Sequence, residues 1–508
     1  MTTTLQIAPI FSDNMVLQRE KDLPIYGGGQ DGFQVRLCFN GISLNTKVRN
    51  GRWLLTLPPQ QAGTRGTLEI TDGQSSFCFS NVVFGDVWLA GGQSNMELEL
   101  QNCLNGKAEL AASFNPDIRF YQALKQVYGT EGFHENERQC RWHVCAQDSA
   151  ATLSAVAFFF ARKINAETGI PIGIINCNWG GTSISAWLSE EQLSRSAAGK
   201  KYLDDYAALV GNKTDEQYEQ EMQEYFAQWS AWDKRVQERR ALDPLVSWEV
   251  LNKECGECPW PQPAGKKSPF RPTNLYHSMI RRVSPFALKG FLYYQGEEDY
   301  TRASDYGEMM CYLIDQWRTD WHDDGLPFLF VQLPMYASRA EMEAGLDKDE
   351  SWQIIRENQY KVSRLIANTG LAVIIDKGEF DNIHPLDKQT VGFRLALQAL
   401  KKVYGRKISA DGPIFKRVER ISGGVIRVYF DHAELGLEAH GSLEGFELAG
   451  SDLRYYAAQA VIEGSTVALS ADEVSEPEHF RYAWYKYGPT PLFGKNGLAA
   501  MPFQASLF

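Results

Sequence analysis

The chain of 508 residues lacks several features that would place it at a membrane or outside the cell. It contains no run of about 18 apolar residues, the length that a membrane-spanning helix needs. Its first nine residues, MTTTLQIAP, have neither the basic region nor the apolar stretch of a signal peptide. We therefore expect a cytoplasmic protein, although a secreted or periplasmic protein trimmed of its signal peptide would show the same pattern.

Positive charge is also in short supply. Lys and Arg number 51 against 63 Asp and Glu, so the formal net charge is −12. This balance disfavours nucleic acid or an anionic membrane as the main partner. It also provides no general attraction for an anionic sugar, which would need a local Arg or Lys that the sequence does not single out.

Cysteine offers little to build a metal centre or a disulfide framework. The count is nine, an odd number, and several lie within apolar runs, as reduced core thiols do. Cys255 and Cys258 have the spacing of two metal ligands, but no second Cys-x-x-Cys supplies the other two that a structural zinc site needs. A disulfide or two free thiols explain this pair better than zinc.

The length predicts about three domains, at roughly 150 residues each. Residues 1–80 contain strand-length alternations separated by glycine turns. Residues 81–405 alternate apolar strands with helices, and residues 406–508 return to short strands. The charged, helical and then proline-rich stretch 190–272 indicates an insertion. We expect an α/β core with a mostly parallel sheet, flanked by two β-rich domains.

The expected insertion contains an amphipathic helix. Tyr218, Met222 and Tyr225 recur at the spacing that places side chains on one helical face. Such a face packs on its own domain more often than on a partner protein. We therefore expect it to be buried within this chain.

A serine stands where a strand turns into a helix. The apolar run 82–90 leads into Gly91 and Gly92, and the helix-compatible segment 96–100 follows Ser94. This arrangement can expose the Ser94 hydroxyl and place its N–H at the head of a helix, as a nucleophile with an oxyanion hole requires. The alternative is a connector that contains serine by chance, because short motifs recur.

An acid and a histidine follow another apolar strand. Asp381 and His384 come after the run 371–376. At this spacing the carboxylate can bond one imidazole nitrogen, leaving the other to take a proton from serine. The chain has only eight histidines, so the pattern is informative, although a structural histidine at a strand end is the alternative. No Gly-x-Ser-x-Gly elbow occurs, which argues against an ordinary α/β-hydrolase.

Two further loops fit the same scheme. The run 172–176 leads to Gly180 and Gly181, and the run 291–294 leads to Gln295. A Gly–Gly turn lets backbone N–H groups approach a ligand, and a Gln side chain can donate to an oxyanion. Each loop alone could be an ordinary turn. Four loops after apolar strands favour one shared site, because open α/β sheets bind ligands at the carboxyl ends of their strands.

Together the four loops resemble the sialate O-acetylesterase family of SGNH hydrolases. The segments that carry the resemblance are GQSNM at 92–96, WGGT at 179–182, YQGE at 294–297 and DNIHP at 381–385. Residues 11–19 and 481–484 resemble the opening and closing segments of that family, so the resemblance covers most of the chain. It implies an SGNH-like catalytic domain and a serine esterase that removes acetyl groups from sugars, first of all from 9-O-acetylated sialic acid.

Carried over position by position, the resemblance implies a role for each motif residue. Ser94 would be the nucleophile, His384 the base and Asp381 the acid that orients the base. The Ser94 and Gly181 N–H groups and the Gln295 side chain would form the oxyanion hole. Many SGNH hydrolases carry Asn in the third block, where this chain has Gln295. The implied partner is an acetylated sugar, with no cofactor.

Two other functions stay open at this point. The first is an esterase acting on acetylated plant polysaccharide such as xylan or mannan, which the sequence separates poorly from a sialate esterase. The second is a non-catalytic carbohydrate-binding protein with a degenerate core. The presence of serine, histidine and aspartate in their motifs counts against the second.

No metal is expected to take part in the reaction. Acyl transfer needs only the serine, histidine and aspartate of the motifs. The acidic run Glu297, Glu298 and Asp299 could form an oxygen-rich site for calcium or magnesium. A solvated loop end, or carboxylates that anchor neighbouring backbone, is the expected explanation of this run.

Overall fold

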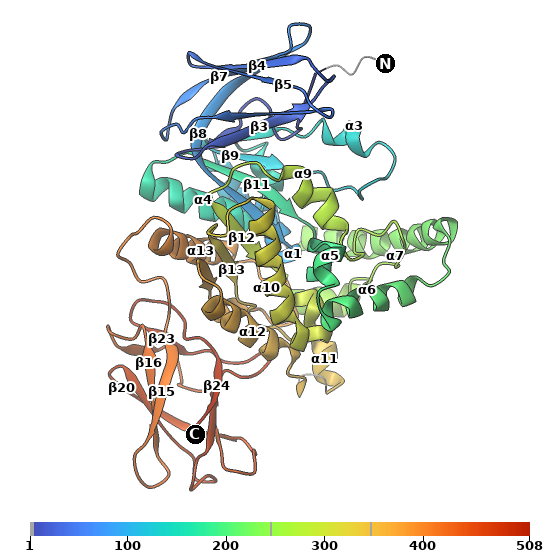
Figure 1. The fold of residues 1–508 in the computed structure, drawn as a ribbon. Coiled ribbons are helices and arrows are strands. Elements are labelled where there is room, and N and C mark those ends of the chain that lie inside the picture. Colours follow the sequence, from blue (N-terminus) through green and yellow to red (C-terminus); the bar gives the residue numbers. More distant parts are fainter. Residues whose placement is uncertain (1–4, 244–245, 346–347, 508) are drawn as a thin grey trace.

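The computed structural model describes residues 5–243, 246–345 and 348–507. The chain forms a mixed α/β protein with a β-rich part at each end (Figure 1). The first part contains strands β1 (Gln6–Ile7), β2 (Val16–Gln18), β3 (Leu23–Gly28), β4 (Gln34–Phe39), β5 (Ile42–Lys47), β6 (Arg52–Leu57) and β7 (Arg65–Thr71). Strand β6 alternates exposed and buried residues along its length, so its apolar side chains share one face.

One long strand joins the N-terminal part to the core. Strand β8 (Ser76–Gly92) pairs antiparallel with β7 in its first half and parallel with β11 (Ile172–Asn178) in its second half. It is partly exposed up to Asn81 and buried at every residue from Val82 onward. The domain boundary expected near residue 80 therefore falls inside a continuous strand.

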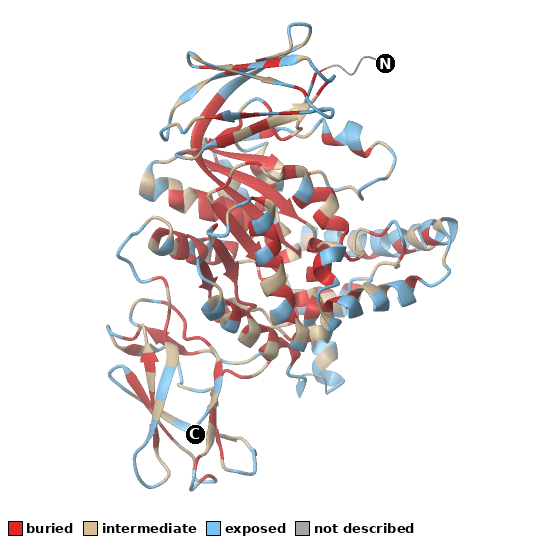
Figure 2. Cartoon of the chain, viewed as in Figure 1, coloured by how far each residue is buried: buried red, intermediate tan, exposed pale blue. Residues whose placement is uncertain are grey.

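The central sheet places β8 in its middle. Its order is β10 (Trp142–Cys145), β9 (Asn115–Gln122), β11, β8, β12 (Gly290–Tyr294), β13 (Phe328–Val331) and β14 (Thr369–Ala372). All pairs along this order are parallel except β9 with β10. Strands β11 and β12 are buried throughout, as expected of a sheet covered on both faces (Figure 2).

Helices cover both faces of this sheet. Trp88 of β8 packs edge-on against Phe160 of α4 (Ala155–Thr168). Three residues later, on the opposite face, Gly91 lies against Trp317 of α10 (Ala303–Asp320). Helix α13 (Lys388–Lys402) packs beside α4, and α12 (Ser351–Leu365) beside α10. The remaining short helices are α1 (Ser94–Glu97), α2 (Gly106–Ala111), α3 (Phe133–Glu137), α5 (Glu190–Leu193), α9 (Arg281–Val283) and α11 (Arg339–Glu343).

The segment expected to be an insertion is helical. Helices α6 (Ala197–Val210), α7 (Asp215–Leu242) and α8 (Trp248–Cys255) project from one side of the core (Figure 1). Tyr218 and Tyr225 on α7 are only 7% and 8% exposed. The Tyr218 ring packs on Gly265 in the proline-rich return, so this face is buried within the chain.

The C-terminal part has its own apolar core, formed between two four-stranded sheets. Its strands are β15 (Ile414–Arg420), β16 (Ile426–Asp431), β17 (Leu437–Ala439), β18 (Phe446–Ala449), β19 (Tyr456–Ala457), β20 (Gln459–Glu463), β21 (Thr466–Ser470), β22 (His479–Tyr482), β23 (Leu492–Gly494) and β24 (Phe503–Ser506). Met335 and Ile375 of the central part reach into this core. The two parts therefore share apolar contacts.

The cysteines and the helices answer two earlier expectations. All nine cysteines are free thiols, Cys255 buried and Cys258 exposed, so this pair forms no disulfide. Within the described ranges, no helix combines the length and apolar character needed to cross a bilayer.

The turn before Ser94 tolerates only glycine. Gly92 has φ 132°, and a Cβ added there would lie 2.1 Å from the Tyr294 carbonyl oxygen. Gly73 also has a positive φ, 87°, but a Cβ added there would have no atom within 4 Å. An alanine at Gly73 would therefore meet the same backbone strain as one at Gly92, without the steric clash. Gly73→Ala should lower the free energy of unfolding by about 1–2 kcal/mol, and Gly92→Ala should lower it by more. Chemical denaturation of both variants checks this, and equal losses would contradict the packing.

Candidate active site

Ser94 occupies the turn between the central strand β8 and helix α1. The strand ends at Gly92 and the helix begins at Ser94, with Gln93 between them. The Gln93 N–H donates to the Tyr294 carbonyl at 3.0 Å, and the Trp179 N–H donates to Gly92 at 3.0 Å. The serine is thus held between the loops that follow the neighbouring strands β11 and β12.

The structure brings Ser94 and His384 into contact across 290 residues of sequence. The His384 Nε2 atom lies 2.8 Å from the Ser94 Oγ atom. Both side chains are partly exposed, so a substrate can reach them. This is the distance at which an imidazole can accept the hydroxyl proton of a nucleophile.

Burial keeps His384 neutral. It lowers the pKa of His384 to about 4, and the positive charge of Lys388 lowers it further in the same direction. A neutral imidazole is the form that accepts a proton. His384 is therefore in the basic form over the whole neutral pH range.

Asp381 does not take the expected place beside His384. Its Oδ1 atom accepts from the Arg339 N–H at 2.9 Å, and its own N–H donates to the Ala337 carbonyl at 2.9 Å. No hydrogen bond or ion pair joins Asp381 to His384 within the described ranges. Asp381 has φ 59°, a left-handed conformation, and its two bonds tie it to the 337–339 segment instead. The expected orienting role is thus not realised here.

Asn382 holds the histidine loop in that position. Its Oδ1 accepts from the His384 N–H at 3.0 Å, and its Nδ2 donates to the His384 carbonyl at 3.0 Å. The same Nδ2 donates to Glu379 at 2.7 Å. Asn382 thus fixes the backbone of the base, a role that the sequence analysis did not assign.

Among the residues described, the Ser94 and Gly181 backbone N–H groups have no hydrogen-bond acceptor. Ser94 is the first residue of α1, so its N–H has no acceptor within that helix. The Gly181 N–H has no hydrogen-bond partner among the residues described. A Cβ added at Gly180 would lie 3.2 Å from the Ser94 Cβ, so this turn packs directly against the serine. These N–H groups are the expected oxyanion donors from the first two blocks.

Gln295, expected as the third donor, has its amide hydrogens committed elsewhere. The Nε2 atom donates to the Thr182 carbonyl at 3.1 Å and to Asp299 Oδ2 at 2.5 Å. The side chain is 1% exposed. Gln295 therefore anchors the glycine loop through Thr182 and does not point an N–H at an oxyanion in this structure.

Asn95, next to the serine, connects three of the four loops. Its Nδ2 donates to Glu297 Oε1 at 2.6 Å and to the Ile383 carbonyl at 2.9 Å. Its Oδ1 accepts from the Lys388 ammonium. All four residues lie in the block segments or directly after them, and Asn95 is fully buried. The serine, the third block and the histidine loop are therefore locked together through one amide.

Two carboxylates of the acidic run 297–299 bond different partners. Glu297 bonds Asn95, while Asp299 accepts from Ser183, Tyr202, the Ile184 N–H and Gln295. Within the parts of the chain described, no three His, Cys, Asp or Glu side chains are grouped to hold a metal ion. These two carboxylates therefore anchor their own surroundings.

Comparison with known proteins fits this geometry. Residues 84–228 and 262–400, more than half of the chain, match the family model described as carbohydrate esterase, sialic acid-specific acetylesterase. The chain belongs to this family. All four loops lie inside the matched segments, and the unmatched stretch 229–261 lies in the helical insertion. The protein is therefore an esterase of the carbohydrate type.

Relatives of this esterase match over nearly the whole chain. Sialate O-acetylesterase of Mus musculus is 29% identical, covering 84% of this chain and 79% of that protein. The Homo sapiens enzyme is 25% identical over 98% of this chain and 92% of that protein. Among solved structures, a carbohydrate acetylesterase from Xanthomonas citri has a TM-score of 0.77 and 29% identity, covering 99% of this chain and 100% of that chain.

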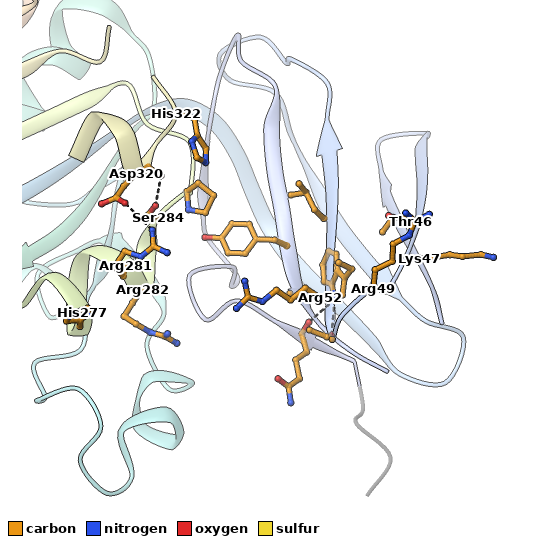
Figure 3. A pocket seen from close by; sticks show the side chains of 18 of the residues that line it. Thr46, Lys47, Arg49, Arg52, His277, Arg281, Arg282, Ser284, Asp320 and His322 are labelled. Carbon is orange, nitrogen blue, oxygen red and sulfur yellow. Dashed lines mark hydrogen bonds and ion pairs between the residues drawn. The ribbon is translucent and has the colours of Figure 1, made fainter. Parts of the chain in front are cut away.

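Two hollows of the esterase differ in their relation to Ser94. A hollow of about 1450 Å³ lies between the N-terminal strands and the core, where Arg52 faces Arg281 and Arg282 across a gap (Figure 3). Ser284, at this hollow, precedes β12, whereas the catalytic loop follows the other end of that strand. The basic hollow thus lies at the sheet edge opposite Ser94. A pocket of about 740 Å³ is lined by Gly181 and Glu298, and Gly180, the neighbour of Gly181, packs against Ser94.

Several site residues were missed by the sequence analysis. Asn95 and Asn382 lie inside the recognised motifs, but the sequence analysis gave roles only to Ser94, Asp381 and His384 beside them. Lys388 lies four residues after His384 at the start of α13, a position with no distinctive signal.

The pKa of His384 predicts the acid limb of activity. Because only neutral imidazole accepts the serine proton, kcat/KM should rise with pH through about 4 and then stay flat toward neutrality. The measurement is kcat/KM for p-nitrophenyl acetate from about pH 3 to 8, with circular dichroism to exclude acid unfolding. An acid limb centred at the ordinary value of 6.5 would contradict the assigned environment.

The positions of Asp381 and Asn382 predict an unusual ranking of variants. Asp381→Asn keeps an oxygen acceptor for the Arg339 N–H, so it should lower kcat by less than about tenfold, against about 10⁴-fold for an aspartate that orients a catalytic histidine. Asn382→Ala removes both bonds to the His384 backbone and should lower kcat more than Asp381→Asn. His384→Ala should be worse than either. Steady-state kinetics on folded proteins give the order, and a loss near 10⁴-fold for Asp381→Asn would restore the triad.

Proposed function

We propose that this esterase hydrolyses O-acetyl esters on sugars, with Ser94 as nucleophile and His384 as general base. The observation that carries the proposal is the 2.8 Å contact between Ser94 Oγ and His384 Nε2. The turn geometry before Ser94 and the lowered pKa of His384 support it. The parallel strands β9, β11, β8, β12, β13 and β14 support an SGNH-hydrolase-type core beneath the site.

The reaction follows the two steps of acyl transfer. His384 takes the Ser94 proton while Oγ attacks the acetyl carbonyl carbon, giving a tetrahedral intermediate. The C–O bond to the sugar then breaks, and His384 returns the proton to the sugar oxygen. Water, deprotonated by His384, attacks the acetyl-serine, and the collapse of the second intermediate releases acetate and restores Ser94.

The oxyanion is assigned to two backbone donors. The Ser94 and Gly181 N–H groups supply the hydrogen bonds that stabilise the developing negative charge. Gln295 contributes by holding the glycine loop through the Thr182 carbonyl. The imidazolium forms together with the oxyanion, so each charge compensates the other in a site where an isolated charge is disfavoured.

The named activity of the relatives points to 9-O-acetylated sialic acid as the first substrate to test. Acetylated xylan or mannan is the second, because the pocket beside Gly181 carries more acidic than basic groups. The non-catalytic alternative predicts no turnover at all. Acetate release from each substrate, and inhibition of p-nitrophenyl acetate hydrolysis by a serine-directed organophosphonate, separate these possibilities.

Removal of the nucleophile is the direct test. Ser94→Ala should lower kcat on p-nitrophenyl acetate and on sugar acetates by at least about 10⁴-fold, because the acyl-enzyme can no longer form. The thermal unfolding midpoint should stay close to that of the wild type, since one hydroxyl is lost. A folded Ser94→Ala protein with near-normal turnover would require a different nucleophile.

Metal removal is expected to leave activity unchanged. The proposed steps use a hydroxyl, an imidazole and backbone N–H groups, and a metal-bound imidazole could not accept the serine proton. The test is exhaustive dialysis against a strong chelator, followed by the acetate-release assay with and without added calcium, magnesium or zinc. Loss of activity that returns with a divalent ion would overturn the metal-free mechanism.

A further inference from the structure

A pocket opens beside the proposed oxyanion donor Gly181. Its volume is about 740 Å³, within the range of about 300–1,000 Å³ that small-molecule ligands occupy. Residues of α6, α7, the return 259–272 and the 297–302 turn line it. Gly181 is both a proposed oxyanion donor and a lining residue, so this pocket is the candidate place for the leaving group of the Ser94 reaction.

An aromatic surface stands at the point where the pocket meets the site. The Trp260 side chain is 46% exposed, and its ring lies so close to Gly181 that a Cβ there would come within 2.1 Å of it. Phe270 supports the ring edge-on at 5.4 Å and 86°. A half-exposed, supported indole offers an apolar face to the C–H side of a sugar ring.

Trp260 also lies where this chain departs from the family. The family match ends at residue 228 and resumes at residue 262, so the stretch between contains Trp260. The residues that contact the acetyl group lie inside the match, whereas this aromatic surface lies outside it. An aromatic side chain outside the matched segments can change which sugar is bound without changing the residues that would cleave the ester.

The charged groups of the pocket leave no cation for an anionic ligand. Lys213 pairs with Glu221 at 2.6 Å, and Arg302 pairs with Asp205 at 2.5 Å. They are the only Lys or Arg lining this pocket among the described residues. Five carboxylates line it, those of Asp205, Glu221, Glu224, Glu298 and Asp299. A sialic acid carboxylate would meet the acidic side chain of Glu224 and no unpaired cation of this lining, and burying such a charge is costly.

Uncharged sugars suit the same lining. Hydroxyl groups donate to carboxylates and accept from amides, and Gln228 and Gln262 line the pocket beside Glu224. Burial and the charges of Asp299 and Glu297 raise the pKa of Glu298 to about 8, so this group can donate as well as accept. The lining therefore offers both donors and acceptors to the hydroxyl groups of a sugar.

We infer that this pocket binds the sugar that carries the acetyl group, that Trp260 is its stacking surface, and that the substrate is an uncharged sugar chain. The inference rests on the proposed function, because it concerns the leaving group of the Ser94 reaction. Wild-type enzyme should then have a higher kcat/KM on acetylated xylo-oligosaccharides than on 9-O-acetylated sialic acid, by at least about tenfold.

Kinetics of Trp260→Ala test the stacking surface. The ratio of kcat/KM for acetylated xylo-oligosaccharide to that for p-nitrophenyl acetate should fall about tenfold, since the small ester does not need the platform. Trp229→Ala is the matched control, because Trp229 is a 37% exposed insertion residue that does not line the pocket. Its ratio should equal that of the wild type. An unchanged ratio in Trp260→Ala, or an equal fall in both variants, would overturn the inference.

Binding without turnover separates the two proposals. Calorimetric titration of Ser94→Ala protein with unacetylated xylo-oligosaccharide should show binding that weakens about tenfold when Trp260→Ala is added. If adding Trp260→Ala weakens this binding, and enzyme that keeps Ser94 hydrolyses sugar acetates, both the pocket and the reaction are supported. If wild-type enzyme hydrolyses no sugar acetate, the proposed function fails, and this titration still decides the pocket.

The charge of the pocket has its own variant. Glu224→Lys places a cation on an exposed pocket position away from Ser94 and His384. It should narrow the preference for xylo-oligosaccharide over 9-O-acetylated sialic acid several-fold, by raising kcat/KM for the anionic ester. A wild-type enzyme that prefers the sialic acid ester would overturn the assignment of an uncharged substrate.

Discussion

The buried amide of Asn95 is the interaction on which the site depends. It donates to Glu297 and to the Ile383 carbonyl and accepts from Lys388, so it joins the serine turn to two loops that lie far away in sequence. Glu297 and Lys388 are buried, and losing the amide would leave a carboxylate or an ammonium without its bond, at a cost of about 1–3 kcal/mol or more. The contact of His384 with Ser94 needs both loops in register, and the sheet alone cannot supply that precision. Asn95 therefore joins three of the four loops into one site.

The electrostatics of the site follow from the same network. Burial lowers the pKa of Lys388 to about 7, while the neighbouring Glu297 and Glu379 charges oppose the shift. Any positive charge that Lys388 keeps disfavours a second one on His384, which helps to hold the imidazole neutral. With its low pKa, His384 is neutral at neutral pH and can accept a proton, but it holds the proton weakly. Such a base suits the proposed reaction, in which the proton returns at once to the sugar oxygen and the oxyanion, rather than Asp381, would compensate the transient imidazolium.

The sequence predicted which loops meet and was less successful with side-chain directions. Ser94, Gly181 and His384 converge because each follows a strand of one sheet, and parallel strands end at the same edge. Asp381 and Gln295 also come to this edge, but their carboxylate and amide turn to Arg339, Thr182 and Asp299. The position of a residue after a strand predicts that it lies near the site. The direction of its side chain depends on the left-handed φ of Asp381 and, for Gln295, on a buried hydrogen-bond network that only the fold assembles. The length of β8 was missed for a similar reason, since its change of partner near Val82 leaves no mark in an apolar run.

Arg52, Arg281 and Arg282 line the basic hollow between the N-terminal strands and the core (Figure 3). This hollow opens at the amino ends of the central strands, while Ser94 follows the carboxyl end of β8. In the pocket lined by Gly181, Lys213 and Arg302 are paired with Glu221 and Asp205. On the proposed assignment, Ser94, Gly181 and His384 lie inside the family match, whereas Trp260 lies in the unmatched stretch 229–261. The chemistry and the choice of substrate would then be encoded in different parts of the chain and could change independently.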